Sequence, residues 1–429
     1  MMFKIKSYYS GCLLLCFLLP GHSAAESLQQ AWHTALNVDH TLKAVQENTI
    51  ASRHRLKSAK AARLPSISVG VGYTALQDTP ASQVNFGGGN IQFPVAENES
   101  LAYKAMTVLP IYTSGQIAGH IDAASSALLA SKQIESGTVL DLKLQVAETY
   151  IAVLRSAKSL EVAESHVSSL IAHANDVKNM HDQGMVSRND LLAAQVALAD
   201  ARQWAIKAGN ILDISRSAYN RLLARPLKQT VELDELQVTF FDQSLASLTN
   251  QAIKKRYELQ VLLEQAKALS SQAKAIRAQS GPQVALSGGY DYQQNQYQVH
   301  EGQWLLNLGM QWKIFDAGLI KNRASATERQ SLSLKQQYDD TLSQIELQVR
   351  QYWLDGQETK KRVKVTEQSI SQAEENLKVN RDRYENGLST NTEVLDAETL
   401  RIRSLDNHAN AIYDAVLANI RLKRAVSDL

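Results

Sequence analysis

The chain has 429 residues, of which 44% are apolar and 21% are charged, with 45 basic and 43 acidic side chains. This composition excludes a disordered chain and a bundle of membrane-spanning helices, and the balanced charge argues against nucleic-acid binding. Both cysteines, Cys12 and Cys16, lie near the start. The remainder therefore holds no disulfide framework, cysteine zinc site or cysteine nucleophile.

A secretory signal peptide is predicted over residues 1–25. Lys4 and Lys6 precede the apolar stretch 12–19, which is followed by small residues before Glu26. The alternative is a membrane anchor, but a spanning helix needs about 20 apolar residues. We therefore expect cleavage after residue 25 and export of a mature chain that contains no cysteine.

The rest of the sequence contains an internal repeat, which is the strongest indication of its organisation. The segments PSISVGVGY and PQVALSGGY share a proline, an apolar alternation, a glycine and a tyrosine. Two further pairs of similar segments follow in the same order. The three pairs begin at Pro65 and Pro282, Ile111 and Ile314, and Gly184 and Gly387. The first copy is expected to carry a longer loop between its first two segments, around residues 86–90.

Each copy is expected to begin with a helix followed by a β-hairpin. The two helices are predicted over 26–64 and 245–281, and each ends just before a proline. The hydrophobic period then changes from helical to two, which predicts hairpins over 65–110 and 282–315.

The predicted strands have a length of about ten residues, which suits a tilted strand that crosses a bilayer. In the clearest strand, every second residue from Trp304 to Ile314 is apolar. A soluble sheet with one wet face is the alternative. Trp304 and Trp312 lie near the two ends of this strand and favour the membrane, because they resemble interfacial aromatic girdles.

A long helical hairpin is predicted after each β-hairpin, over 111–226 and 316–429, with an inter-repeat linker over 227–244. The outgoing helices are expected from Gln116 to about His181 and from Leu319 to about Tyr384, and their residues are mostly helix-compatible. Each helix would be on the order of 100 Å long. Apolar residues at steps of seven favour coiled-coil packing, and an ordinary amphipathic bundle is the alternative.

Four strands per chain cannot close a barrel, because known closed barrels have about eight or more strands. An open sheet edge in lipid would leave backbone groups without hydrogen bonds. Several copies of the chain are therefore expected to share one barrel. Two copies would supply eight strands and three would supply twelve, and the strand pattern by itself does not choose between them.

Several segments resemble the TolC-type outer-membrane efflux and secretion duct family. These are the helix-to-strand junctions at Pro65 and Pro282, the helix entry at 109–115, and the segment 383–390 with Asp396 beyond it. The resemblance covers essentially the whole mature chain. It implies a mostly α fold with a membrane β portion, in which three protomers share a twelve-stranded barrel that a periplasmic α-helical barrel continues.

The resemblance also implies a function, that of the outer-membrane channel of a tripartite efflux or type I secretion system, with no enzymatic activity and no cofactor. The implied partners are two further copies in a homotrimer, a periplasmic adaptor (membrane fusion) protein, an inner-membrane pump or ABC transporter, and outer-membrane lipid. The adaptor would dock on two turns, formed by Gly184, Met185, Val186 and Ser187, and by Gly387, Leu388, Ser389 and Thr390.

The family's periplasmic gate can be carried over to matching positions. Glu393 and Asp396 match the two acidic positions that ring the closed entrance. Asp190 matches an acid of the first copy, and Tyr384 matches a tyrosine that bonds to that acid across the gate.

The gate sequence departs from the family pattern at two positions. Ser389 replaces an arginine and Asn189 replaces a threonine, so the resemblance implies the acidic ring but not the full set of gate hydrogen bonds.

The acidic positions also have a physical reading of their own. Glu393 and Asp396 are three residues apart, so both can face one side of a helix. Carboxylates from three chains in a narrow neck would favour cations and could bind multivalent metal ions. The alternative is that they only stabilise a helix N-terminus. Capping explains Asp396 less well, because it lies farther from the glycine.

Other candidate sites are set aside. His166 and His173 are seven residues apart, too far for one metal, and are expected to be exposed polar positions. The glycines at 87–89 lack the context of a phosphate loop and are expected at an exposed loop tip. No catalytic, cofactor or metal site is predicted. A periplasmic coiled-coil scaffold or adaptor without a barrel remains the alternative function, and the strand pattern argues against it.

Overall fold

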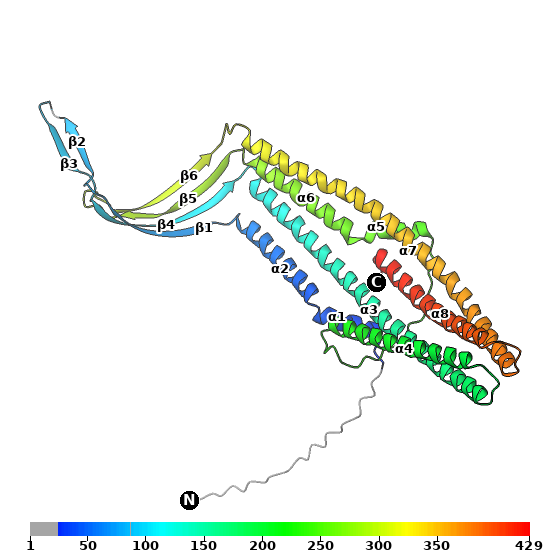
Figure 1. The fold of residues 1–429 in the computed structure, drawn as a ribbon. Coiled ribbons are helices and arrows are strands. Elements are labelled where there is room, and N and C mark those ends of the chain that lie inside the picture. Colours follow the sequence, from blue (N-terminus) through cyan, green and yellow to red (C-terminus); the bar gives the residue numbers. More distant parts are fainter. Residues whose placement is uncertain (1–24, 86) are drawn as a thin grey trace, which may run out of the picture.

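The computed structural model describes residues 25–85 and 87–429, so the predicted signal peptide lies almost entirely outside the described residues. A curved β-sheet forms one end of the molecule, and long helices extend from it to two tight turns at the other end (Figure 1). The first repeat contains α1 (Leu28–Val38), α2 (His40–Ala61), β1 (Ser66–Ala75), β2 (Ala81–Asn85), β3 (Asn90–Pro94), β4 (Glu99–Tyr112), α3 (Gln116–Asp182) and α4 (Arg188–Leu222).

The second repeat has the same order of elements without the second pair of strands. It contains α5 (Leu245–Lys255), α6 (Tyr257–Ala278), β5 (Gln283–Gln293), β6 (Gly302–Gln311), α7 (Leu319–Glu385) and α8 (Asn391–Ala425). The outgoing helices α3 and α7 each have 67 residues, and the returning helices α4 and α8 each have 35. The predicted internal repeat and both outgoing helices are therefore confirmed.

The prediction of one unbroken helix before each proline is wrong. In the first repeat the helix is interrupted at Asp39, whose backbone is extended and whose carboxylate accepts a hydrogen bond from the Leu42 amide (2.7 Å), which starts α2. In the second repeat it is interrupted at Arg256, which is also extended. The Arg256 guanidinium donates to the carbonyl of Ala425 at the end of α8 (3.2 Å), so a tertiary contact accompanies this break.

The four long strands form one antiparallel sheet in the order β1–β4–β5–β6. The pairing of β4 with β5 joins the hairpins of the two repeats, and β1 and β6 are its outer strands. The four predicted strands are confirmed, and both outer strands expose apolar side chains. Ile67 on β1 is 76% exposed and Trp304 on β6 is 81% exposed.

The segment expected as a longer loop in the first repeat is more ordered than predicted. Strands β2 and β3 pair with each other and form a separate ribbon that projects beyond the main sheet (Figure 1). The glycines at 87–89 lie between them, and Gly87 has a left-handed backbone (φ 54°). The predicted exposed tip is thus the turn of a two-stranded ribbon.

The helical body is held by apolar clusters and by hydrogen bonds that fix the inter-repeat segment. The largest cluster brings together α1–α4, α8 and this segment around the buried rings of Tyr150 and Tyr219. The Tyr150 hydroxyl group lies 2.7 Å from two carbonyl oxygens, those of Glu26 and Asp234. Among the described residues, no helix combines the length and the apolar character needed to cross a membrane.

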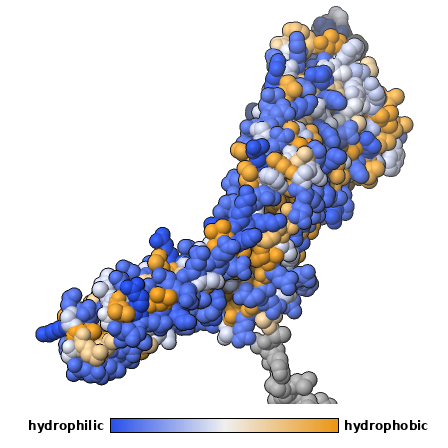
Figure 2. All heavy atoms as spheres, turned by 90° about the vertical axis from the view of Figure 1, so that its right-hand side faces the viewer, coloured by the Kyte–Doolittle hydropathy of each residue, from blue (hydrophilic) through white to orange (hydrophobic). Residues whose placement is uncertain are grey.

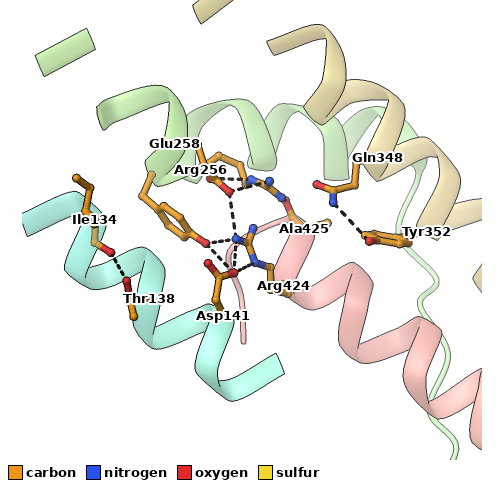
Figure 3. A network of polar contacts seen from close by, with 10 residues as sticks. Ile134, Thr138, Asp141, Arg256, Glu258, Gln348, Tyr352, Arg424 and Ala425 are labelled. Carbon is orange, nitrogen blue, oxygen red and sulfur yellow. Dashed lines mark hydrogen bonds and ion pairs between the residues drawn. The ribbon is translucent and has the colours of Figure 1, made fainter. Parts of the chain in front are cut away.

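The C-terminal end of α8 is fixed by a network of charged groups (Figure 3). Arg424 donates to Asp141 of α3 through Nε (2.8 Å) and also lies 3.1 Å from Glu258 of α6. The ring of Tyr257 packs so closely on Gly137 of α3 that a Cβ there would lie 2.2 Å from a ring carbon. A second apolar cluster of α5, α6, α7 and α8 lies beside this network. The network of charged groups therefore joins α3, α6 and α8.

Candidate functional site

The turns between α3 and α4 and between α7 and α8 lie together at the end of the molecule farthest from the sheet (Figure 1). Each turn contains a glycine with a left-handed backbone, Gly184 (φ 75°) and Gly387 (φ 71°), which suits the end of a helix. In the first turn the Met185 amide donates to the Met180 carbonyl (2.8 Å), and the matching bond of the second turn has the same length. The predicted equivalence of the two turns is confirmed.

Asp190 and Ser187 form a reciprocal cap at the start of α4. The Ser187 hydroxyl accepts from the Asp190 amide (3.2 Å), and the Asp190 carboxylate accepts from the amide and hydroxyl of Ser187 (3.2 and 2.7 Å). Such a cap satisfies amides that the first turn of a helix leaves free. The carboxylate of Asp190 is thereby engaged within its own turn.

Glu393 has a similar local role at the start of α8. The Thr390 hydroxyl accepts from the Glu393 amide (3.3 Å), and the Ser389 hydroxyl donates to the Glu393 carboxylate. The hydrogen bond from Ser389, followed by the interaction of the carboxylate with the backbone of Thr390, lowers the pKa of Glu393. The capping alternative therefore applies to Glu393, although its carboxylate stays exposed.

Asp396 lies one turn further along α8 and is exposed on the same side of the helix as Glu393. Val394 and Ala397, on the adjacent side, are buried in a cluster that joins all four long helices near the turns. In the part of the chain that the structure describes, the side chain of Asp396 has no hydrogen bond or ion pair. Two carboxylates on one free face are the arrangement expected for an acidic ring, and local capping does not account for Asp396.

Tyr384 is 8% exposed at the end of α7, and its hydroxyl group has no hydrogen-bond partner among the described residues. Burial raises the pKa of Tyr384, and the nearby charge of Asp190 adds to this effect. The two residues are thus neighbours, but the hydrogen bond implied by the family resemblance is not formed within this protomer. The Asp190 carboxylate contacts Ser187 instead.

The expectation that His166 and His173 are exposed is wrong. His173 is 5% exposed, and its Nε2 lies 2.7 Å from Oδ1 of Asn391. The amide nitrogen of Asn391 in turn donates to the backbone carbonyl of Asp190 (3.1 Å). Burial lowers the pKa of His173, as does the charge of Arg381. These contacts join α3, α8 and α4.

A buried carboxylate lies next to these histidines. Glu398 of α8 is 1% exposed and accepts from Arg401 (2.9 Å), His166 (3.3 Å) and Arg381 (3.4 Å). Burial alone would raise the pKa of Glu398, but hydrogen bonds, first those from His166 and Arg401, lower it to about 2. Helices α3, α7 and α8 therefore meet at one ionised group.

Sequence reasoning missed Asn391 and Glu398, although a signal for them exists. Along α8 the buried positions Asn391, Val394, Glu398 and Ile402 recur at the spacing of one helical face. Two polar residues within an otherwise apolar stripe indicate a buried polar contact, because burial without a partner is costly.

The two turns enclose a groove with a volume of about 470 Å³. Most of the residues expected to dock an adaptor line it, together with Asp190 and Tyr384. They are Met185, Val186, Ser187, Gly387, Ser389 and Thr390. Across residues 25–85 and 87–429, no group of three or more histidine, cysteine or acidic side chains could hold a metal ion.

Comparison with known proteins places this geometry in a wider group. The outer membrane efflux protein family matches residues 31–225 and 248–427. Outer membrane protein TolC of Vibrio cholerae is 21% identical over 417 residues, which cover 94% of this chain and 91% of that protein.

Solved structures share the fold at low sequence identity. The outer membrane protein VceC of Vibrio cholerae has a TM-score of 0.80 at 18% identity and covers 93% of this chain and 95% of its own. The CmeC outer membrane channel of Campylobacter jejuni has a TM-score of 0.80 at 13% identity, with coverage of 94% and 85%.

Proposed function

Because this chain belongs to the outer membrane efflux protein family, we propose that it is the outer-membrane channel of a tripartite efflux or type I secretion system. In this role it is a passive trimeric duct from the periplasm to the exterior. The observation that carries the proposal is a four-stranded sheet with two open edges, joined to helices of 67 residues. No single copy can close such a sheet.

The outer strands explain how a shared barrel would close. Strands β1 and β6 carry exposed apolar side chains and pair on one side only. In lipid an unpaired edge is costly, so β6 of one copy is expected to pair with β1 of the next. Three copies give the twelve strands that the family resemblance implies.

The helices would close into a tube through the same rotation that brings β6 of one copy beside β1 of the next. The free side of α4 exposes a series of apolar residues, among them Val196, Ile206 (76% exposed) and Ile214, and α7 exposes Leu347 and Val365. Apolar side chains lie between polar ones over much of the face that Figure 2 shows. A contact of α4 with α7 of the next copy would bury these residues, and a rotation that closes gives a ring.

The two turns form the periplasmic entrance in this proposal. Glu393 and Asp396 from three copies make an acidic ring, and Asp190 and Tyr384 lie beside it. An adaptor docks on the turns Gly184–Ser187 and Gly387–Thr390, and the inner-membrane pump supplies the energy. Tyr384 has a buried hydroxyl group without a partner among the described residues, and Asp190 lines the same groove, so these two residues are the expected gate pair.

The decisive experiment is to isolate the mature chain from membranes and measure its assembly. We expect extraction with detergent but not with salt, the mass of a trimer, and ion conductance in planar bilayers. A chain that is released by salt and remains a stable monomer in water would contradict the proposal and favour the periplasmic scaffold.

The acidic ring has its own test in the same bilayers. We expect Glu393→Ala combined with Asp396→Ala to reduce the preference of the pore for cations, because the two exposed carboxylates would be lost. Unchanged selectivity would remove both residues from the entrance.

A further inference from the structure

We propose that His166 and His173 of α3, together with Asn391 and Glu398 of α8, form a latch that holds the two helical hairpins together at their turns. The latch thereby positions the acidic face of α8. This inference rests on the proposed channel function for its meaning, but its contacts are within one protomer.

The location of the contacts makes them a latch. The hairpin α3–α4 meets the hairpin α7–α8 chiefly along α3 and α8, while α4 and α8 touch only slightly. Any widening of the entrance that separates the hairpins must therefore open the α3–α8 seam near the turns. Contacts across this seam resist widening, whereas contacts within a hairpin do not.

The first part of the latch is a chain of hydrogen bonds through three helices. The Asn391 amide nitrogen donates to the Asp190 carbonyl, so its oxygen is the atom that faces His173. His173 must therefore carry its proton on Nε2 to donate across the 2.7 Å contact. The chain links α3 to the first turn of α8 and to the first turn of α4.

The second part of the latch is the buried carboxylate of Glu398. His166 of α3 and Arg381 of α7 approach it from two helices, and Arg381 also donates to Ser169 of α3. The indole ring of Trp204 on α4 packs edge-on against His166 at 6.1 Å between centroids. Separation of the seam would remove partners from a carboxylate that is 1% exposed, which is costly.

The latch sets the direction of the acidic face because both lie on one rigid helix. Asn391 precedes Glu393 by two residues, and Glu398 follows Asp396 by two. Residues two apart on a helix do not share a face. When Asn391 and Glu398 face α3, the carboxylates of Glu393 and Asp396 consequently face away from it, on the exposed side.

His173 also makes the latch sensitive to acid. His173 faces Glu398 of α8, Arg381 and Tyr384 of α7, and Asp176 of its own helix. His166 faces Glu398, Arg401 and Arg381, and Trp204 covers it from α4. Because burial and Arg381 lower the pKa of His173, the packed seam favours the neutral ring. When the seam opens, the pKa of His173 returns toward the ordinary value of histidine. As the pH falls below that value, His173 binds a proton more readily in the open form than in the packed form, so the population of the open form rises.

The test compares histidine variants with the wild-type channel in planar bilayers. From about pH 8 to about pH 5, where histidine changes charge, we expect wild-type conductance to rise. The rise should be roughly fivefold or more, the lower end of typical coupling between sites. The double variant His166→Gln with His173→Gln keeps side-chain N–H donors but cannot take up a proton, and should lose the rise. Asn391→Ala should raise conductance already at neutral pH.

His120→Gln is the matched control, because His120 is exposed near the sheet end of α3. It should retain the wild-type pH profile. Equal profiles for the double glutamine variant and the wild type, or an Asn391→Ala channel that conducts like the wild type at neutral pH, would overturn the latch.

A second measurement does not need a conducting channel. The mature chain has no cysteine, so spin labels can be attached to cysteines introduced at Asn175 of α3 and Thr399 of α8, both of which are exposed. The distance between the labels should lengthen in acid, and should stay constant in the double glutamine variant. If the distance does not change with pH, the latch is contradicted whether or not the protein conducts ions. If the distance changes with pH but no conductance is found, only the proposed channel function is contradicted.

Discussion

The two ends of α8 are both held by buried charge, but with different chemistry. At the C-terminal end, Arg424 and Arg256 bind carboxylates of α3 and α6 beside an apolar cluster (Figure 3). At the end near the turns, Glu398 binds His166 as well as Arg401 and Arg381. His173 and Asn391 form a separate hydrogen bond beside it. Arginine keeps its charge throughout the physiological range, whereas histidine does not. The C-terminal end is therefore a fixed anchor of arginine pairs, whereas the end near the turns combines arginine pairs with histidines and is adjustable.

Removal of the buried carboxylate at the turns is expected to have the largest effect. Glu398→Ala leaves Arg381 and Arg401 without their shared partner, and should lower the local free energy of unfolding by about 3 kcal/mol. Hydrogen exchange of α3 and α8 near the turns measures this loss. Glu375→Ala, on the exposed side of α7, is the control and should change exchange little. If Glu398→Ala and Glu375→Ala show equal protection from hydrogen exchange, Glu398 does not hold the seam.

Overpacking of the anchor should have the next largest effect. In Gly137→Ala the new methyl group would meet the ring of Tyr257, so we expect a loss of about 2 kcal/mol in the free energy of unfolding. Denaturant titration followed by circular dichroism measures it. Gly356→Ala is the control, because nothing lies within 4 Å of a Cβ there. If the anchor and the seam are independent, Gly137→Ala leaves the conductance at neutral pH unchanged.

Loss of a helix cap at the turns should have a smaller effect. Ser187→Ala removes the hydroxyl that caps α4 and should cost about 1 kcal/mol. Faster amide exchange confined to the first turn of α4 is the expected readout. The variant also removes the hydroxyl hydrogen bond to the Asp190 carboxylate, which keeps only the bond from the backbone amide of residue 187. A spread of fast exchange to α8 would mean that the caps and the seam act as one unit.

The smallest expected effect is the response of Glu398 itself to mild acid. Its pKa is about 2, below the ordinary value of 4.5, so its contribution to stability is present above pH 4.5 and is lost as the pH falls toward 2. Glu398 therefore stays ionised between about pH 8 and about pH 5. In this range we expect any pH-dependent change in the seam to disappear when both histidines are replaced by glutamine. A remaining transition in that range would assign the pH response to another group.

Much of the fold was predictable because the relevant signals are local. The change from a helical period to a period of two placed the hairpins after Pro65 and Pro282, and uninterrupted helix-forming sequence placed α3 and α7. The breaks at Asp39 and Arg256 were missed, because neither a glycine nor a proline marks them and Arg256 is held by a contact with the end of α8. The ribbon formed by β2 and β3 was missed because its strands have only five residues each.

The candidate site was predictable only in part. The turn glycines and the exposed pair Glu393 and Asp396 follow from short-range spacing, which fixes the shared face of a helix. The burial of His173 does not follow from short-range spacing, because its partner Asn391 lies in the other repeat and is far away in the sequence.

By itself, the sequence determined a duplicated chain of paired strands and very long helices, since hydrophobic period and helix propensity act over a few residues at a time. Only the tertiary structure decided which face of α8 meets α3, and with it the identity of the polar groups that the seam encloses. The reason is physical: a periodic pattern states that a face is buried, but the partner of a buried polar group is chosen by helices that the chain brings together from distant positions.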